Sequence, residues 1–482
     1  MTPEQFRRYG HAVVDWVADY WAGLAERPAD YPVAPAPPPG AVAAQLPAAA
    51  PETGEPIETL LADLDRLVMP ANTHWQHPSF FGYFPANTSG PSVLGDLVSS
   101  GLGTQGMLWS TGPAATELET VMLDWLAGLL DLPAQFHSSG AGGGVIQDSA
   151  SSANLVALLA ALHRASGGSW RESGVDRRLT VYTSTEGHSS IEKAARIAGL
   201  GSAAVRQIEV DSQLAMRPDA LRARVAADLA AGAVPALVVA TIGTTSTTAI
   251  DPLPQIGPIC REFGLWLHVD AAYAGAAAIC PELRYTHAGL EYADSYCFDP
   301  HKWLLTGFDC DAFWVADRAE LVTALTVLRE YLRNAVNDTD AVIDYRDWQV
   351  PLGRRFRALK LWFVLRWYGA QGLRTHIRTS VELAAYLAAQ LHHDPRFEVV
   401  APHPFSLVCF RLRASDEVNQ QLLKRLNASG ALFLTNTRVG GRYVLRMAIG
   451  SPYTRRTHID AAWQVIRETA ADLRTAGPPD SD

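Results

Sequence analysis

The chain has 482 residues, of which 48% are hydrophobic and 19% are charged, and its formal net charge is −10. This composition is typical of a globular protein and excludes a largely disordered chain, and the length predicts two or three structural units. The acidic balance argues against nucleic acid or an anionic membrane surface as a partner.

The cysteines are scattered and form no Cys-x-x-Cys pair: Cys260, Cys280, Cys297, Cys310 and Cys409. This pattern indicates neither a disulfide framework nor a metal site, and it favours a reducing compartment. The first residues lack an apolar signal core, and no apolar run approaches the roughly 18 residues that span a bilayer. We therefore expect a soluble, cytoplasmic protein.

The N-terminal region predicts two helices separated by a proline-rich stretch. Residues 4–26 carry apolar side chains at helical spacing, and Pro28 ends this pattern. The Pro/Ala-rich residues 28–56 exclude a regular helix or strand and predict an extended arm. A second helix is expected at about 57–69.

Residues from about 90 to 320 alternate between helical and strand patterns. Helices are expected at 114–130, 150–165, 190–198, 217–231 and 254–263. Strands are expected at 178–184, 205–210, 236–243, 265–272, 293–299 and 311–317. This alternation predicts an α/β fold with a mostly parallel sheet, whose ligands bind beyond the carboxyl ends of the strands.

The last part of the chain, from about residue 365, alternates apolar and polar residues at 407–413 and 443–450 within helical surroundings. We interpret it as a smaller α+β unit. The expected domains are an N-terminal helical and proline-rich arm (1–89), a large α/β domain (90–364) and a small C-terminal α+β domain (365–482).

Lys302 follows a predicted strand in an apolar and aromatic segment, Ser295–Leu305. A desolvated lysine has a depressed pKa and forms Schiff bases with carbonyls, most commonly that of pyridoxal 5′-phosphate (PLP). The alternative, more frequent for an isolated His-Lys-Trp, is a lysine whose stem is packed and whose amine lies in water.

Asp270 ends another apolar strand, where a buried carboxylate needs a partner. In the PLP hypothesis that partner is the protonated pyridine nitrogen, and the alternative is a cap on the following helix. The segment Gly142–Asn154 joins a glycine run to small hydroxylated residues before a helix, which suits a phosphate. Simple helix capping by Ser149 or Ser151 is the alternative.

Two further strand ends complete the pattern. His188 lies between a strand and a helix and could stack on a flat ring or move a proton, or be a structural histidine. Thr245 follows Gly243 after another strand, where a plain turn is the alternative. An α/β sheet would bring all of these residues to one edge. Their order along the chain therefore favours a PLP site over the separate structural roles given as alternatives.

The chain resembles the PLP-dependent group II decarboxylases, specifically the aromatic-L-amino-acid decarboxylases, over nearly its whole length. The similar segments include THWQHPSFFGYFPANTS, GGGVIQDSAS, HSSIEKA, WLHVDAAYAGAA, FDPHKWLL and DYRDWQVPLGRRFRALKLWFVLR. The resemblance implies the aspartate aminotransferase fold type I, PLP as cofactor and a homodimer with its active site at the subunit interface. Residues 1–70 would then bury their apolar faces on the second subunit.

The resemblance also implies residue roles. Lys302 is the Schiff-base lysine, Asp270 pairs with the pyridine nitrogen, and His188 stacks on the ring. Tyr331, in a loop over about 325–340, returns a proton to Cα after carbon dioxide leaves. The implied cofactor contacts are Ser149, Ala150, Ser151, His188, Thr245, Asp270, Ala272, Asp299, His301 and Lys302. The implied substrate contacts are Trp75, Tyr83, Phe84, Pro85 and Ala86.

Two positions depart from the family pattern. Asp299 stands where animal members often have Asn, which adds a negative charge beside the phosphate region. Ala86 stands where catechol-preferring members often have Thr, so the pocket is less able to discriminate hydroxylated from plain rings. We therefore expect tryptophan or phenylalanine to be accepted alongside tyrosine and DOPA.

The predicted function is a carboxy-lyase that converts aromatic L-amino acids to arylalkylamines and carbon dioxide. The first alternative is an aromatic aldehyde synthase, whose members tend to carry Phe at the position of Tyr331 or Asn at that of His188. The second is a decarboxylase of a non-aromatic amino acid. The chain lacks the glycine motif of a nicotinamide-dependent oxidoreductase, which argues against that class. A non-enzymatic interaction protein is also disfavoured, because Lys302, Asp270, His188 and Tyr331 would then have no role.

Overall fold

The computed structural model describes residues 1–175, 178–327 and 342–475. By its contacts the chain divides into two compact units. The first unit comprises residues 1–85, 383–400 and 408–482, and the second comprises residues 86–382 and 401–407. The division into three domains, with boundaries at residues 89 and 364, stays a prediction.

The second unit contains a seven-stranded sheet in the order β1-β7-β6-β5-β4-β2-β3. Its strands are β1 (Gly143–Gln147), β2 (Leu179–Ser184), β3 (Val205–Ile208), β4 (Val234–Thr241), β5 (Trp266–Asp270), β6 (Ser295–Phe298) and β7 (Asp311–Val315). Adjacent strands from β6 to β3 pair in parallel, whereas β7 is antiparallel to both β6 and β1. The expected mostly parallel sheet is confirmed.

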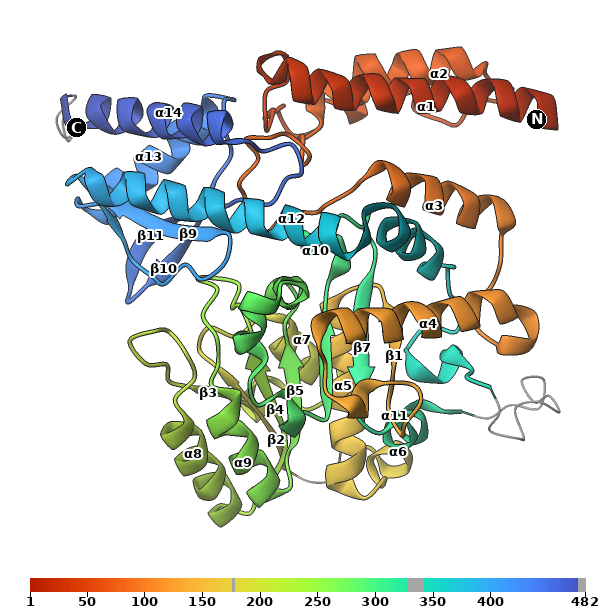
Figure 1. The fold of residues 1–482 in the computed structure, drawn as a ribbon, viewed down its shortest axis with the longest axis vertical. Helices are drawn as coiled ribbons and strands as arrows, with labels where there is room; N and C mark the ends of the chain where they lie inside the picture. Colours follow the sequence, from red (N-terminus) through yellow and green to blue (C-terminus); the bar gives the residue numbers. More distant parts are fainter. Residues whose placement is uncertain (176–177, 328–341, 476–482) are drawn as a thin grey trace. The chain divides into compact units, whose positions relative to one another are not determined.

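Helices cover this sheet on both faces, as Figure 1 shows. The α-helices of the unit are α3 (Gly90–Leu102), α4 (Pro113–Leu130), α5 (Ala150–Ser166), α6 (Trp170–Ser173), α7 (Ser190–Ile197), α8 (Pro218–Ala230), α9 (Leu253–Phe263), α10 (Pro300–Trp303), α11 (Arg318–Leu325) and residues 358–382 of α12 (Ala358–His393). A buried apolar core joins α5, α7 and α11 to one face of the sheet. Helices α8 and α9 lie side by side and pack on β4.

Local sequence signals set the ends of these helices. Ser149 caps α5 with its hydroxyl, and Gly167 ends the helix in the left-handed conformation, with φ of 62°. Pro113 lies in the first turn of α4, where its missing N–H costs nothing, and Gly264 ends α9 as expected. These signals explain why the helices predicted in the middle of the chain are confirmed to within a few residues.

Strand β1 is the element of the sheet that the sequence did not reveal, since its Gly-Gly-Val-Ile-Gln segment was interpreted only as a phosphate loop. A buried ion pair holds it in place. Glu119 on α4 accepts the N–H of Ile146 at 2.8 Å, and Arg354 donates to the Ile146 carbonyl at 3.0 Å. Arg354 and Glu119 also bind each other at 2.6 and 3.1 Å, so both charges are compensated.

The first unit contains a four-stranded sheet in the order β10-β11-β9-β8. Its strands are β8 (Phe397–Val399), β9 (Leu407–Leu412), β10 (Thr435–Val439) and β11 (Arg442–Ala448). Its apolar core includes side chains from the last turns of α12 (Ala358–His393), from α13 (Asp416–Ala428) and from α14 (Arg456–Thr475). The two predicted strands of the tail are therefore confirmed as β9 and β11.

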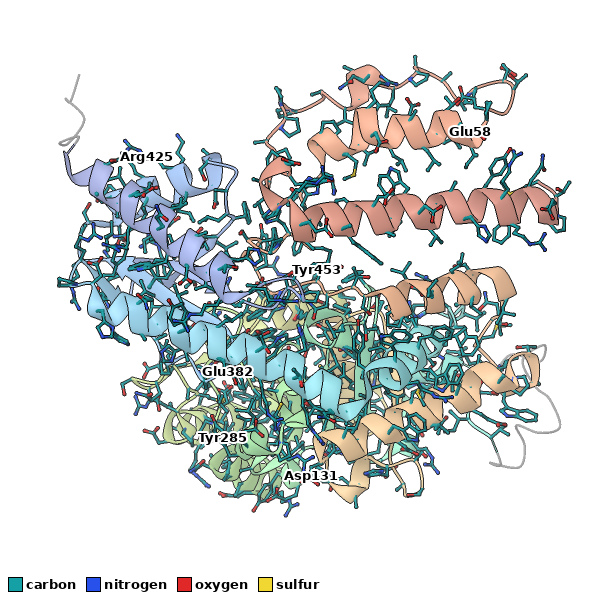
Figure 2. All side chains as sticks on the ribbon, turned by 45° about the horizontal axis from the view of Figure 1, so that its top comes forward. Glu58, Asp131, Tyr285, Glu382, Arg425 and Tyr453 are labelled. Atoms are coloured by element: carbon teal, nitrogen blue, oxygen red, sulfur yellow. The ribbon has the colours of Figure 1, made fainter. Side chains whose placement is uncertain are left out.

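The same unit contains α1 (Pro3–Glu26) and α2 (Ile57–Asp63), which lie side by side in Figures 1 and 2, where Glu58 marks α2. A hydrogen bond of 2.9 Å from Trp16 to Asp65 joins α1 to the turn after α2. Between the helices, residues 28–56 form only the short 3₁₀ turns Pro28–Asp30 and Ala43–Gln45. The expectation that this stretch contains no regular helix or strand is confirmed.

Among the residues that the structure describes, no helix is both long and apolar enough to cross a bilayer.

Candidate active site

The carboxyl edge of the seven-stranded sheet gathers most of the predicted cofactor residues. Asp270, at the end of β5, pairs in register with Thr241 on β4 and with Cys297 on β6. The N–H of Asp299 donates to the Ala272 carbonyl at 2.8 Å, which joins the segment after β6 to the segment after β5. Asp270, Asp299 and Lys302 therefore lie at one edge, as the strand order requires.

Lys302 lies on the single turn α10, which begins directly after β6 and Asp299. Its Nζ is 2.7 Å from the Asp299 carboxylate. Burial is the largest single effect and lowers the pKa of Lys302, but the ion pair and hydrogen bond with Asp299, together with the charges of nearby acids such as Asp270, raise the net pKa above the ordinary value. The expected depression of this pKa is therefore wrong for the chain alone, because the sequence pattern did not reveal the ion pair.

Asp299 is the acidic residue that departs from the family pattern, and the structure gives it several partners. Besides Lys302, its carboxylate accepts the N–H of Ala150 at 3.2 Å and lies 3.6 Å from His301 Nε2. Burial raises the pKa of this nearly inaccessible carboxyl, but Lys302 and His301 lower it more, and the net pKa falls below the ordinary value. Asp299 is thus a buried anion that faces a cation and the start of α5.

His301 is buried beside this pair and has a defined orientation. Its Nδ1 accepts the N–H of Cys310 at 3.0 Å, so the neutral ring carries its proton on Nε2, toward Asp299. Burial is the main cause that lowers the pKa of His301, although Asp299 opposes it. The ring is therefore placed as a neutral hydrogen-bond donor at this edge.

The residues predicted to hold the phosphate lie at the start of α5. Ser149 caps the helix by accepting the N–H of Ser152 at 3.4 Å, so the capping alternative is realised for this residue. Capping and anion binding are compatible, because the helix dipole and the first N–H groups still face the sheet edge. Ser151 is exposed at this end of the helix, beside Ala150.

Asp270 is held by hydrogen bonds to both of its carboxylate oxygens. The N–H of Ala272 donates to one oxygen at 3.0 Å, and the Asn154 amide donates to the other at 2.9 Å. The following segment is a 3₁₀ turn, Ala274–Ile279, rather than an α-helix that Asp270 could cap. The side chain is therefore an oriented, buried acceptor at the sheet edge.

His188 is linked to Asp270 through two side chains that the sequence did not single out. Asn154 Nδ2 donates to Ser190 Oγ at 3.0 Å, and Ser190 Oγ lies 2.8 Å from His188 Nδ1. The N–H of Ser190 also donates to His188 Nδ1 at 3.2 Å, which places the proton of the neutral ring on Nε2. Partial burial lowers the pKa of His188, with Asp270 opposing this effect.

Asn154 could have been found from the sequence, because it is a polar residue on the buried face of an apolar helix. It is 2% exposed, one turn after Ala150. A buried amide requires hydrogen-bond partners, and here both come from the site. Ser190 gives a weaker signal, since serine is common at the start of a helix.

The donor and acceptor set at this edge fits PLP. It offers an amine for the aldehyde, a carboxylate for the pyridine nitrogen and a helix N-terminus for the phosphate. Several buried oxygens on the neighbouring elements have no hydrogen-bond partner among the described residues: Asn154 Oδ1, Thr183 Oγ1, Ser184 Oγ and Thr241 Oγ1. Thr245 is exposed just beyond β4. The polar character of the edge agrees with a polar ligand.

The predicted substrate residues of the first unit belong to an aromatic cluster. Trp75 and Tyr83 stack with ring centroids 5.6 Å apart, and Trp75 lies 4.5 Å from Phe80. Phe433, which the sequence did not single out, stacks on Phe80 at 5.5 Å. Trp75 and Tyr83 keep 39% and 55% of their surface exposed, so aromatic area remains accessible on this unit.

Phe84 and Pro85 follow Tyr83 in the chain and have partners of their own. The guanidinium of Arg446 lies 5.4 Å from the Phe84 ring centroid, and Pro85 packs so closely on Gly450 that a Cβ there would lie 2.4 Å from the proline ring. Ala86 is partly buried and is the first residue of the second unit. Tyr331 and most of the predicted 325–340 loop lie outside the described residues.

Comparisons with known proteins agree with this chemistry. Residues 39–413 match the pyridoxal-dependent decarboxylase conserved domain. The chain is 46% identical to phenylacetaldehyde synthase from Arabidopsis thaliana, over 98% of this chain and 97% of that protein. It is 44% identical to aromatic-L-amino-acid decarboxylase from Mus musculus, over 99% of both.

A solved structure shows the same fold. The crystal structure of Oryza sativa TDC with PLP and tryptamine superposes with a TM-score of 0.94 at 41% identity, covering 98% of this chain and 99% of that one.

Proposed function

The chain belongs to the pyridoxal-dependent decarboxylase family, and on that premise we propose that it decarboxylates aromatic L-amino acids to arylalkylamines. It is a PLP-dependent carboxy-lyase of the predicted fold. The observation that carries the proposal is the joint placement of Lys302 and Asp270 at one sheet edge, next to the start of α5. Tryptophan, phenylalanine, tyrosine and DOPA are the proposed substrates.

When bound, PLP withdraws electrons from the Cα–carboxylate bond and so allows carbon dioxide to leave. Lys302 supplies the amine that holds the cofactor and later releases the product. Asn154 and Ala272 fix the Asp270 carboxyl group at the sheet edge, where the pyridine nitrogen is proposed to lie. His188 is proposed to lie against the ring, with its Nε2–H set by Ser190.

The fate of Cα after decarboxylation decides between an amine and an aldehyde. The relatives include both a phenylacetaldehyde synthase and an aromatic-L-amino-acid decarboxylase, so membership of the family leaves both products open. This chain has His188 and Tyr331, where aldehyde-forming members tend to carry Asn or Phe. We therefore favour proton return by Tyr331, which gives the amine.

The substrate proposal is tested by a panel of amino acids. We expect purified, PLP-loaded protein to form amine from tryptophan, phenylalanine, tyrosine and DOPA, because Trp75 and Tyr83 offer exposed aromatic surface. Glutamate should react at least ~100-fold more slowly in kcat/KM, since its short, charged side chain cannot cover the exposed faces of Trp75 and Tyr83 as an aromatic ring does. Chromatography of the amines measures this. Comparable rates with glutamate would contradict the aromatic preference.

We also infer a homodimer, because helix α3 buries its small residues and exposes its large apolar residues. In α3 the buried residues are Ser92, Gly95 and Ser99, and a Cβ on Gly95 would lie 2.6 Å from the Lys360 backbone. The large apolar residues of the same helix are exposed: Val93, Leu94, Leu97, Val98 and Leu102. An apolar stripe of this kind marks an interaction surface, and a second copy of the chain is the proposed occupant.

Helix α1 supports the same inference within the first unit. Of its 24 residues only Gly23 and Leu24 are buried, whereas Phe6, Val13 and Val14 are exposed. A helix this long gains little stability from so small a buried face. The placement of the active site at the subunit interface is part of the same proposal.

A matched pair of substitutions tests the dimer. Leu97 on α3 and Leu229 on α8 are 48% and 43% exposed, so their replacement by Glu should perturb each monomer similarly. We expect the wild type and Leu229→Glu to be dimeric and Leu97→Glu to be largely monomeric by light scattering. A monomeric wild type, or a dimeric Leu97→Glu variant, would contradict the inferred interface.

We propose a cytoplasmic location on the basis of the cysteines. All five are buried and none is in a disulfide. This suits a reducing compartment.

A further inference from the structure

Asp311 is a buried acid at the same sheet edge, and it has no role in the function proposed above. It is the first residue of β7, and the antiparallel direction of β7 brings it to the edge where the parallel strands end. Its register partner on β1 is Gln147, and the next pair on its other side joins Ala312 to Phe298. Asp311 is 0% exposed.

The hydrogen bonding of Asp311 requires a proton. Neither of its carboxyl oxygens has an N–H or O–H donor within the described part of the chain. The antiparallel register of β6 and β7 continues from the Phe298–Ala312 pair and brings Asp299 and Asp311 opposite each other, where each carboxyl group shifts the pKa of the other. Two ionised carboxylates offer only acceptors, so a hydrogen bond between them can form only when one of the two acids is protonated.

The surroundings show which acid holds the proton. Asp299 contacts the Lys302 ammonium at 2.7 Å and the Ala150 N–H at 3.2 Å, and both stabilise its negative charge. Asp311 has no cation in hydrogen-bonding contact within the described residues. Burial and the neighbouring Asp299 charge raise the pKa of Asp311 well above its ordinary value. The proton therefore belongs on Asp311.

We propose that Asp311 is a positioning residue that stays a neutral carboxylic acid and donates a hydrogen bond to Asp299. The bond holds Asp299 between Lys302 and the start of α5. It also leaves one negative charge on the two acids rather than two. The placement of the cofactor phosphate at the start of α5 belongs to the function proposed above, and the consequence for cofactor binding rests on it.

That consequence is a dependence of PLP affinity on pH. A second charge on the pair would repel the phosphate, so affinity should fall as Asp311 ionises at alkaline pH. The charged and titratable groups around Asp311 are Asp270, Tyr296, Cys297, Asp299, His301, Lys302 and Cys310. Burial raises the pKa of the phenol and of both thiols, so these three groups are neutral near pH 7.

The first test measures PLP binding to the full chain across pH for the wild type and Asp311→Asn. The amide keeps a hydrogen-bond donor but cannot ionise. We expect its affinity at neutral pH to lie within about threefold of the wild type, without the additional alkaline loss that the wild type shows. Lys302 is present in both proteins, so its own titration cancels in the comparison. Binding by Asp311→Asn more than tenfold tighter at neutral pH would show that Asp311 is ionised, and would overturn the proposal.

A second pair of variants isolates the hydrogen bond. Asp311→Ser and Asp311→Ala leave nearly the same space and differ by one hydroxyl. We expect the alanine variant to bind PLP about tenfold more weakly than the serine variant, because only serine can donate to Asp299. Equal affinities would overturn the positioning role. This pair also serves if the asparagine variant does not fold.

A third measurement needs no cofactor. The infrared difference spectrum between cofactor-free wild type and Asp311→Asn at pH 7 should contain the carbonyl stretch of a protonated carboxylic acid, with a shift in D₂O. Carboxylate bands alone would overturn the proposal. Should this stretch be present while none of the proteins binds PLP, the proposed function fails and the protonation of Asp311 stands.

Discussion

Replacement of Lys302 by Ala should abolish amine formation and covalent attachment of PLP. Lys302 is the amine at the sheet edge that faces Asp299, and the family chemistry needs an amine there to hold the cofactor and release the product. We expect kcat to fall on the order of 10²–10⁴-fold or more, in the range that loss of a positioned proton-transfer group produces. Amine formation and mass spectrometry after borohydride reduction measure the two effects.

Lys193 provides the control for this variant. It is an exposed lysine on α7, five residues after His188, and takes no part in the proposed site. Lys193→Ala should keep wild-type activity and the reduced PLP adduct on Lys302. If Lys302→Ala retained the adduct at another lysine together with near wild-type activity, the assignment of the cofactor amine to Lys302 would be wrong.

The second large effect concerns the product rather than the rate. Tyr331→Phe should shift the main product from amine to aldehyde, because the phenol proposed to return a proton to Cα is gone. Dioxygen can then take two electrons from this carbon and leave as hydrogen peroxide, and water replaces the nitrogen on the oxidised carbon, which gives aldehyde and ammonia. We expect the amine to become the minor product, which simultaneous assays of amine, aldehyde and peroxide would show.

Tyr285→Phe is the matched control for this change. Tyr285 is 61% exposed and labelled in Figure 2, and it plays no part in the proposed chemistry. This variant should form amine like the wild type. If Tyr331→Phe also forms only amine at the wild-type rate, Tyr331 does not supply the proton.

The alternation of strands and helices predicted the large sheet well, because most of the parallel strands are short, buried and largely apolar runs between helices with clear caps. Strand β1 escaped prediction because its two glycines resemble a ligand loop. Its place depends on the Glu119–Arg354 pair, whose members lie 235 residues apart in the chain. The antiparallel direction of β7 likewise depends on pairing rather than on local sequence.

In the site, too, residues could be predicted from their local sequence, whereas contacts between separate segments could not. Lys302, Asp270 and His188 were predicted because each follows a strand and carries reactive chemistry. The ion pair that raises the pKa of Lys302 was not predicted, since a motif gives no orientation for Asp299. Asp311 was seen only as part of a strand. Asp311 lies near Asp299 only because β6 and β7 pair in antiparallel register, and the sequence alone does not specify this pairing.

We propose that this carboxy-lyase returns a proton to Cα and releases an amine. The most direct test incubates PLP-loaded wild type with L-tryptophan and follows carbon dioxide, tryptamine, ammonia and dioxygen together. We predict one tryptamine per carbon dioxide, with no ammonia release and no dioxygen uptake. Aldehyde and ammonia formed with matching dioxygen uptake, in place of tryptamine, would show that Cα is oxidised rather than protonated.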